Sequence, residues 1–349
     1  MNAVGVDQID GQRREGGSAA VMPLLDGIGD PLILLSGGRI VAANRAAADL
    51  LHGPLVGTAI EEVLPEAAVR ALSHSDSTTT ILADIGGDKR HWELRVSRVG
   101  KRRRLLHLMD RTAIEAAERM RVDFVANASH ELRTPIAAIT GFAETLADDE
   151  AGGDPETRRH FLDIIQREAR RMQRLVEDLM SLSRIEADRH VAPDGTVEMV
   201  ATVREAAQAA AEQRGRSSDL TLETGPSGAM VRGDAAQLGQ LVHNLVSNGF
   251  KYSQPGTSVT VSLTADATMV RLVVADGGEG IAAQHLPRVT QRFYRANAPR
   301  SRAVGGTGLG LAIVKHIVER HGGRLEFASE LGQGTTVTVT LPPDVTAAS

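Results

Sequence analysis

Residues 129–135 read Ser-His-Glu-Leu-Arg-Thr-Pro and lie inside a helical pattern. Positions i and i+4 of a helix share a face, so His130 and Thr134 point the same way, and Glu131 can turn toward the imidazole edge. Pro135 removes a backbone donor and bends the helix beyond the histidine, which opens His130 to another molecule. A neutral imidazole is a nucleophile near neutral pH, and a carboxylate on its second nitrogen fixes the tautomer. The chain has eleven histidines, and any one of them is more often structural, so the role of His130 depends on the other motifs.

The composition is that of an ordinary soluble protein, with room for two or three domains in 349 residues. A net charge of −5 argues against nucleic-acid binding driven by bulk charge. The absence of cysteine excludes disulfides and thiolate metal sites. No stretch reaches the about 18–20 consecutive apolar residues of a membrane helix. We expect no membrane span, no direct nucleic-acid partner, and a cytoplasmic location, either for the whole protein or for the cytoplasmic portion of one that associates with a membrane.

The N-terminal third predicts a flexible tail, residues 1–20, followed by a small α+β domain, residues 21–110. Apolar runs at 31–35 and 39–43 flank Ser-Gly-Gly, which is the signal of a β-hairpin, and Asn44 can cap the helix that follows. Three further strands are expected at residues 78–85, 91–99 and 104–109.

This pattern, together with Met-Asp-Arg-Thr at residues 109–112, resembles a PAS sensor domain. The resemblance implies a PAS-like domain that either binds a small ligand or only relays conformation and dimerises.

Residues 111–190 predict two long helices, about 112–146 and 156–187, joined by a loop rich in Asp and Gly. Apolar residues of the second helix recur at steps of three and four, and these are Phe161, Ile165, Ala169, Met172, Val176, Leu179 and Leu182. Two helices alone cannot bury both stripes, so we expect an antiparallel helical hairpin that forms a four-helix bundle in a homodimer. Packing of the hairpin against another domain of the same chain is the alternative.

Residues 195–342 alternate helix and strand, which predicts an α/β sandwich, with a short tail at 343–349. The expected helices are 201–214, 233–251 and 309–321. The expected strands are 219–223, 258–263, 270–275, 324–327 and 335–341.

Three polar clusters in this region predict a nucleotide site. Asn244 and Asn248 are i and i+4 on one helix, with Lys251 one turn on. Amide oxygens suit Mg²⁺ and an ammonium suits phosphate. Asp276 ends an apolar strand in Asp-Gly-Gly-Glu-Gly-Ile, where a carboxylate can accept the adenine amino group and the glycines let the backbone approach the base.

The third cluster, residues 305–311, reads Gly-Gly-Thr-Gly-Leu-Gly-Leu and runs into a helix, whose start favours phosphate. It lacks the Gly-Lys-Ser/Thr of a P-loop and the preceding strand of a dinucleotide fold. Between the second and third clusters lie arginines of a candidate lid, namely Arg292, Arg295, Arg300 and Arg302.

The order Ser-His-Glu-Leu-Arg-Thr-Pro, Asn-x₃-Asn-x₂-Lys-Tyr, Asp-x-Gly-x-Gly-Ile, Arg-Phe-Tyr-Arg and Gly-Thr-Gly-Leu-Gly-Leu resembles a two-component sensor histidine kinase over residues 119–341. The resemblance implies an α+β multidomain chain whose last domain is a GHKL-type (Bergerat) α/β sandwich that binds ATP and Mg²⁺. It also implies phosphoryl transfer to an aspartate of a separate response regulator. The run from Leu286 to Arg295 is similar to phosphate-regulon sensor kinases.

The resemblance implies roles for individual residues. His130 is the phospho-acceptor, Glu131 the general base or orienting carboxylate, and Thr134 the residue that positions water for dephosphorylation of the partner. Asn248 is the Mg²⁺ ligand and Asp276 the adenine acceptor. Other expected nucleotide contacts are Asn244, Lys251, Tyr252, Gly278, Gly280, Arg295, Gly306, Thr307, Gly308, Leu309 and Gly310.

The chain departs from this pattern at Gly277, where many relatives have Asn, so an amide contact is missing there. Two other classes of function are weighed against the kinase. An ATPase of the same sandwich fold, of the chaperone or topoisomerase type, would not need the helix around His130. A signalling scaffold that binds nucleotide without turnover is favoured only by Gly277.

Overall fold

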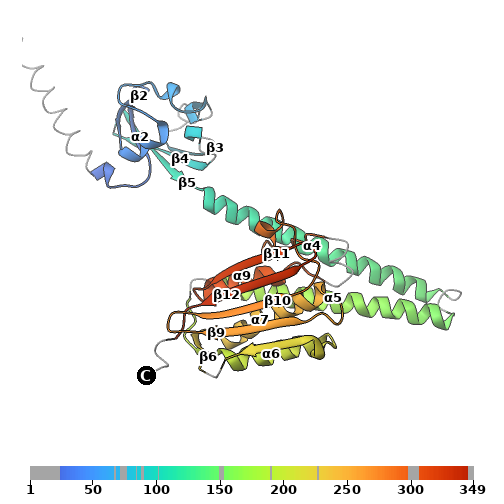
Figure 1. The fold of residues 1–349 in the computed structure, drawn as a ribbon. Coiled ribbons are helices and arrows are strands. Elements are labelled where there is room, and N and C mark those ends of the chain that lie inside the picture. Colours follow the sequence, from blue (N-terminus) through green and yellow to red (C-terminus); the bar gives the residue numbers. More distant parts are fainter. Residues whose placement is uncertain are drawn as a thin grey trace, which may run out of the picture. The chain divides into compact units, whose positions relative to one another are not determined.

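The computed structural model describes residues 24–66, 68–70, 77–83, 85–87, 90–100, 102–148, 153–188, 191–225, 228–297 and 306–344. The chain divides into two compact units, Met1–Asp123 and Phe124–Ser349 (Figure 1). The expected N-terminal tail lies outside the described residues. No helix among the described residues has the length and apolar character needed to cross a membrane.

The first unit is built on one antiparallel sheet of order β2-β1-β5-β4-β3. Its elements are β1 (Leu32–Ser36), β2 (Arg39–Ala43), α2 (Arg45–Leu51), β3 (Ser77–Ala83), β4 (His91–Val99) and β5 (Arg103–Asp110). The predicted hairpin is confirmed, since β1 and β2 pair across Gly37 and Gly38, both with positive φ. The fold is α+β as expected, and its assignment to the PAS class stays a prediction.

Asn44 fixes the start of α2 from a fully buried position. Its Oδ1 accepts hydrogen bonds from Ala47 N at 3.0 Å and from Leu32 N at 2.9 Å. Its Nδ2 donates to three carbonyl oxygens, those of Leu25, Ile28 and Asp30. The predicted N-cap is therefore confirmed, and the same side chain also ties the chain before β1 to the helix.

The long helix α4 (Thr112–Ala147) is fastened to β4 at its start. His91 N donates to Thr112 Oγ1 at 2.9 Å. Arg119 Nη2 lies 3.1 Å from His91 Nε2 and 2.8 Å from Glu115 Oε2. Because arginine can only donate, His91 Nε2 is the acceptor, and Nδ1 of the same ring lies 3.2 Å from Glu115 Oε2. The three side chains close a ring that joins the sheet to the helix.

The second unit begins with the rest of α4 and continues with α5 (Pro155–Ala187), the predicted hairpin of helices. The helix continues through Pro135, so the carbonyl oxygen of Glu131 lacks its usual i+4 donor. Asp154 caps α5 by accepting from Thr157 N at 2.8 Å. Leu175, Leu182 and Ile185 on α5 are buried in the core shared with the following domain.

The predicted α/β sandwich is confirmed in residues 196–341. Its strands are β6 (Thr196–Glu198), β7 (Leu220–Thr224), β8 (Met230–Arg232), β9 (Val259–Ala265), β10 (Val270–Asp276), β11 (Arg324–Glu330) and β12 (Gly334–Leu341). The main sheet has the order β11-β12-β10-β9-β7, in which only the β7–β9 pair is parallel. Its helices are α6 (Met199–Gln213), α7 (Ala235–Tyr252) and α9 (Gly310–Arg320).

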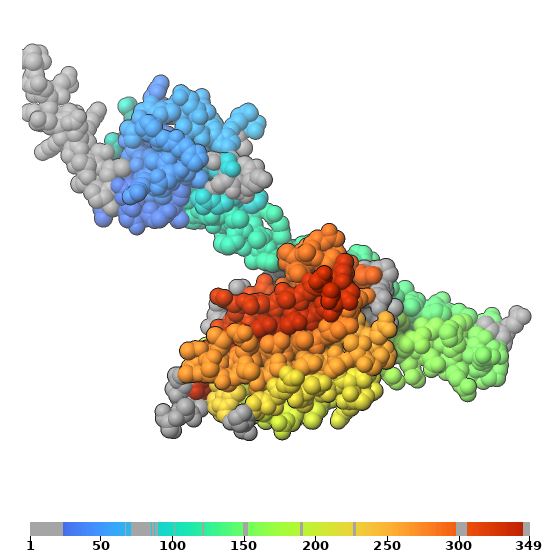
Figure 2. Space-filling view, in the orientation of Figure 1, coloured from blue at the N-terminus to red at the C-terminus, as the bar shows by residue number. Residues whose placement is uncertain are grey.

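Apolar side chains of the three helices and of alternate strand positions form one core. On β10, for example, Val270, Leu272 and Val274 are buried, as the period of two in a half-buried strand requires. The sheet turns its other face to solvent, where Figure 2 shows it as a continuous surface. The core thus fixes α7 against β10, the two elements that carry the predicted nucleotide residues.

His321 joins the end of α9 to the start of α7 and is only 4% exposed. Its Nε2 accepts from Asp234 N at 3.1 Å, and its Nδ1 donates to the carbonyl oxygen of Ile317 at 2.7 Å. Acceptance at Nε2 requires the neutral ring, and burial lowers the pKa of His321. Arg320 and Asp234 are the charged neighbours that influence it.

We expect acid to weaken this junction. The imidazole of the unfolded chain takes up a proton near pH 6.5, whereas the buried imidazole does so only at lower pH. The contribution of neutral His321 to the free energy of unfolding is therefore complete above about pH 6.5. It is lost as the pH falls below that value, by at most about 1.4 kcal/mol per pH unit. Hydrogen exchange in residues 234–245, corrected for intrinsic rates, measures the opening free energy. In His321→Asn the opening free energy should depend less on pH. An unchanged pH dependence would contradict the role given to His321.

Candidate functional site

The polar face of α7 lines a cavity of 1410 Å³. Asp234 caps the helix by accepting from Ala236 N at 2.9 Å and Gln237 N at 3.2 Å. The opposite face is apolar and buried in the core. Asn244, Asn248, Lys251 and Tyr252 all line the cavity, and the common face of the first three was predicted from their spacing. Asn244 Nδ2 is buried without a hydrogen-bond partner in the described residues, so the cavity wall presents an unpaired donor.

Asp276 closes one side of the same cavity at the end of β10. Its Oδ1 accepts from Gly278 N at 2.9 Å, and burial raises the pKa of Asp276. Gly280 has φ +69°, and a Cβ there would lie 1.9 Å from the carbonyl oxygen of Glu330, so no other residue fits. Gly280 lines the cavity, and the backbone N–H of Gly278 holds the aspartate.

Gly277, the departure from the expected pattern, has a close neighbour. A Cβ at this position would lie 2.9 Å from Thr257 Cγ2, so a larger residue would require the Thr257 side chain to move. Asn248 still lines the cavity.

The glycine-rich segment meets α7 from the other side. Gly306, Thr307, Gly308 and Gly310 line the cavity. Leu309 is fully buried in the apolar core, so it offers the nucleotide no side chain.

Gly308 has φ +76°, and its carbonyl oxygen accepts from Phe293 N at 2.8 Å. A Cβ on Gly308 would lie 2.9 Å from the Cα of Phe293. The glycine segment and the Phe293 turn are thus held together. Arg300, Arg302 and Gly305 lie outside the described residues.

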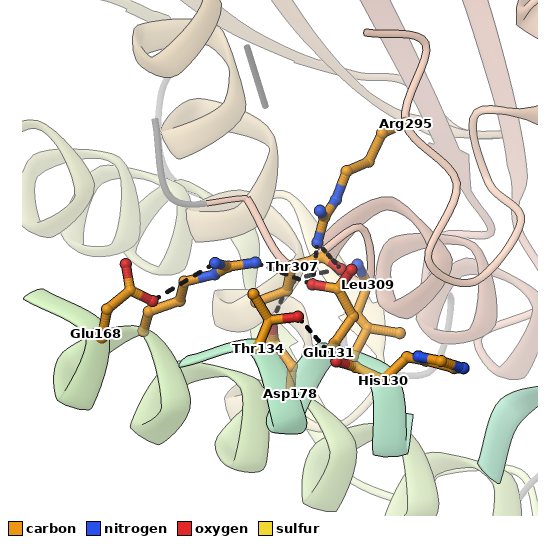
Figure 3. A network of polar contacts seen from close by, with 9 residues as sticks. His130, Glu131, Thr134, Glu168, Asp178, Arg295, Thr307 and Leu309 are labelled. Atoms are coloured by element: carbon orange, nitrogen blue, oxygen red, sulfur yellow. Dashed lines mark hydrogen bonds and ion pairs between the residues drawn. The ribbon is translucent and has the colours of Figure 1, made fainter. Parts of the chain in front are cut away.

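His130 is exposed on α4, and Figure 3 shows its ring pointing away from Glu131, Arg295 and Thr307. Thr134 Oγ1 donates to the carbonyl oxygen of His130 at 3.3 Å, one turn back on the helix. Glu131 Oε2 accepts from Arg171 Nη2 at 2.9 Å and from Arg295 Nη2 at 2.8 Å (Figure 3). In this arrangement the carboxylate predicted to serve the histidine is held by two arginines instead.

The helical hairpin and the glycine-rich segment touch through further polar pairs. Thr307 Oγ1 donates to Asp178 Oδ2 at 2.7 Å, and Arg295 Nη2 also donates to the carbonyl oxygen of Thr307 at 3.0 Å. Nearby, Arg292 forms an ion pair with Glu186, and its guanidinium lies 5.4 Å from the centre of the Phe124 ring. Arg295 therefore connects the glycine segment to the neighbour of His130.

Two residues of this network, Asp178 and Arg171, were missed by the sequence reasoning. Asp178 lies between Leu175 and Leu182 in the buried stripe of α5, and burial raises the pKa of its carboxyl group. A carboxylate inside an apolar stripe is the signal that could have revealed it. Arg171 lies seven positions before Asp178, on the same helix face.

Comparison with known proteins agrees with this layout. Residues 120–188 match the family model described as the His Kinase A (phospho-acceptor) domain. Residues 233–345 match the model described as Histidine kinase-, DNA gyrase B-, and HSP90-like ATPase. A crystal structure of the histidine kinase ThkA in complex with the response regulator protein TrrA covers 90% of this chain and 96% of its own, with a TM-score of 0.51 and 21% identity, which shows the fold alone.

Two curated proteins are similar in sequence to a large part of this chain. The phosphate regulon sensor protein PhoR of Pseudomonas aeruginosa is 39% identical over 257 residues, which is 72% of this chain and 56% of PhoR. The sensor-like histidine kinase SenX3 of Mycolicibacterium smegmatis is 36% identical over 238 residues, 68% of this chain and 62% of SenX3. The chain thus spans little more than half the length of these relatives.

Fold and site together define a GHKL-type ATP-binding domain that follows a phospho-acceptor helical hairpin. The chain belongs to the two-component sensor histidine kinases and is similar to the phosphate-regulon sensors.

Proposed function

We propose that this chain phosphorylates His130 from MgATP and passes the phosphoryl group to an aspartate of a response regulator. The observation that carries the proposal is Arg295, which binds both the glycine segment of the ATP cavity and Glu131, the residue next to the exposed His130. The segment expected to hold the terminal phosphate is therefore within one side-chain length of the phospho-acceptor turn. Glu131 and Thr134 keep the roles of proton acceptor and water-positioning residue as parts of this proposal.

The transfer exchanges one bond for another. An imidazole nitrogen of His130 forms the P–N bond, the bond between the γ-phosphorus and the bridging oxygen breaks, and ADP leaves. The attacking nitrogen supplies its lone pair, and the proton on the other ring nitrogen goes to Glu131. For this to occur, the imidazole must turn toward the cavity and Glu131 must release Arg295, which then faces the γ-phosphate. Positioning and charge stabilisation supply most of the rate.

The residues present fit a nucleotide with Mg²⁺. Asn248 offers an amide oxygen, and within the described ranges no cluster of three or more His, Asp or Glu side chains could hold a metal by itself. A cation at Asn248 would therefore also need the phosphate oxygens of the nucleotide as ligands. When bound, Mg²⁺ neutralises phosphate charge. In this proposal Asn244, with its unpaired buried Nδ2, and Lys251 orient the phosphates, and both line the cavity.

The hairpin supports a homodimer in this proposal. Apolar side chains remain exposed along α4 and α5, among them Val125, Ile136, Leu162, Val176 and Met180. A four-helix bundle with a second copy would cover them.

The likeness to PhoR supports a response regulator of phosphate control as the partner in this proposal. A phosphotransfer profile against the response regulators of the source organism would test it. Preference for another regulator would contradict it.

The kinase proposal is tested by incubating the full chain with MgATP labelled on the γ-phosphate. We expect protein-bound phosphate that is lost in acid and stable in base, the signature of phosphohistidine. A nucleotide-binding scaffold without turnover would bind ATP and carry no such label. The label should pass to an added cognate receiver domain.

Adenine recognition gives a separate prediction at Asp276. In Asp276→Asn, the amide oxygen can still accept from Gly278 N, but the amide N–H₂ would face the adenine amino group, placing two donors opposite each other. We expect ATP affinity to fall about 10- to 100-fold and selectivity over GTP to decrease. Titration calorimetry measures both. The matched control is Asp266→Asn. Asp266 lies in the exposed turn before β10 and accepts from Thr268 N. Equal losses of ATP affinity in both variants would contradict the role of Asp276 in adenine recognition.

A further inference from the structure

The wall of the ATP cavity beside Lys251 carries more positive charge than the expected nucleotide residues supply. Lys251 from α7, Arg214 from the end of α6, Arg174 from α5 and Arg295 all line the cavity. Burial, followed by the charges of Arg214, Arg295 and Arg174, lowers the pKa of Lys251 to about 8. Cations held this close without matching anions disfavour one another.

Carboxylates line the cavity as well, namely Glu177, Asp178, Glu205, Asp276 and Glu279. Asp178 is the carboxylate that favours the charged form of Lys251, and burial raises its own pKa. Arg295 is already paired with Glu131.

Arg214 forms no ion pair with any described residue, and its polar contact is a donation from Nη2 to Ser247 Oγ at 3.3 Å. Burial lowers the pKa of Arg214 as well. A half-buried guanidinium without a counter-ion is an unfavourable arrangement that a bound anion would relieve.

The position of Arg214 is fixed by the fold. It is the C-cap of α6, and Gly215, with φ +63°, ends the helix directly after it. Ser247 lies on the cavity face of α7, between Asn244 and Lys251, and holds the guanidinium toward that face.

Arg216, two residues on, is different, because it pairs with Asp219 and donates to the carbonyl oxygens of Phe250, Ser253, Gln254 and Thr257. Arg216 is therefore structural, whereas Arg214 is left for a ligand.

We propose that Arg214 binds the triphosphate of ATP, and so adds a phosphate contact from the end of α6 to those expected from α7 and the glycine segment. The inference rests on the proposed function, since it assumes that the cavity holds ATP. Its guanidinium fork matches phosphate oxygens, and Ser247 orients it.

The experiment compares ATP, ADP and adenosine binding to the full chain by titration calorimetry. In Arg214→Gln we expect ATP affinity to fall about 10- to 100-fold, ADP affinity to fall less, and adenosine affinity to stay unchanged. Arg204→Gln, on the exposed face of the same helix, should bind all three as the parent chain does. Unchanged ATP affinity, or equal losses for ATP and adenosine, would overturn the proposal.

A second readout distinguishes a phosphate contact from a structural effect. Removal of the Arg214 charge should raise the pKa of Lys251, so the alkaline decline of ATP binding should move to higher pH in Arg214→Gln. Arg214→Lys should keep part of the ATP affinity, because it retains the charge but not the guanidinium fork. If the glutamine variant does not fold, a loss in Arg214→Lys that is larger for ATP than for adenosine supports the proposal, and equal losses contradict it. If the parent chain binds ATP with this pattern but His130 takes no label, the proposed function fails and the role of Arg214 stands.

Discussion

Replacing His130 by glutamine should abolish transfer of label from γ-labelled ATP to the protein, by roughly a thousandfold or more. The amide nitrogen of glutamine is not a nucleophile, so no P–N bond can form. The side chain is exposed and its ring contacts none of the polar network in Figure 3, so the substitution leaves Glu131, Arg295 and Asp178 in place. Autoradiography of the full chain after a short incubation with MgATP measures the loss, and calorimetry should show unchanged ATP affinity.

The control is another exposed histidine of the same hairpin. His160 lies near the start of α5, far along the helix from the polar network, and its ring is 5.9 Å from that of Phe161. His160→Gln should accept label as fully as the parent chain. If His130→Gln keeps the label while the acid lability of the phosphate persists, a different histidine is the acceptor and the assignment is wrong.

Local features of the fold were predictable because local chemistry determines them. Asn44 caps α2 and the glycines at 37–38 make the hairpin, as their residue types require. The amides at i and i+4 on α7 fall on one face because a helix has 3.6 residues per turn, and the core then orients that face to the cavity. Asp276 at the end of an apolar strand meets the same cavity for a similar reason, since β10 packs against α7.

Contacts between distant segments were not predictable in this way. Glu131 was expected beside His130, but its oxygen is held by Arg171 and Arg295, which lie 40 and 164 residues away in the chain. Nothing in a local pattern reveals such a pairing, because it depends on how the hairpin meets the glycine segment. Leu309 was expected at the nucleotide, but the start of α9 turns it into the core. Arg214 was not predicted, because what distinguishes it is that it forms no ion pair with any described residue.

The second large effect is expected for Glu131→Gln. The carboxylate has two uses for the same oxygen, pairing with the arginines as seen here and taking the proton from His130 in the proposed reaction. Glutamine still accepts a hydrogen bond from Arg171 or Arg295, but it cannot take a proton at neutral pH and it weakens both ion pairs. Loss of a positioned general base costs about 10²- to 10⁴-fold, so autophosphorylation at saturating ATP should fall by that factor.

Glu168→Gln provides the matched control for Glu131→Gln, because Glu168 pairs with Arg171 at 3.5 Å and, among the described residues, forms no ion pair with Arg295. It should lower the rate less than about threefold, as expected for a partly exposed ion pair. Single-turnover labelling at saturating MgATP separates the chemical step from ATP binding. The two roles of Glu131 predict opposite changes in the rate of autophosphorylation. If the carboxylate served only to hold Arg295 away from the γ-phosphate, Glu131→Gln would free that arginine and raise the rate. A large loss with unchanged ATP affinity would therefore assign the proton to Glu131, and a gain would assign it elsewhere.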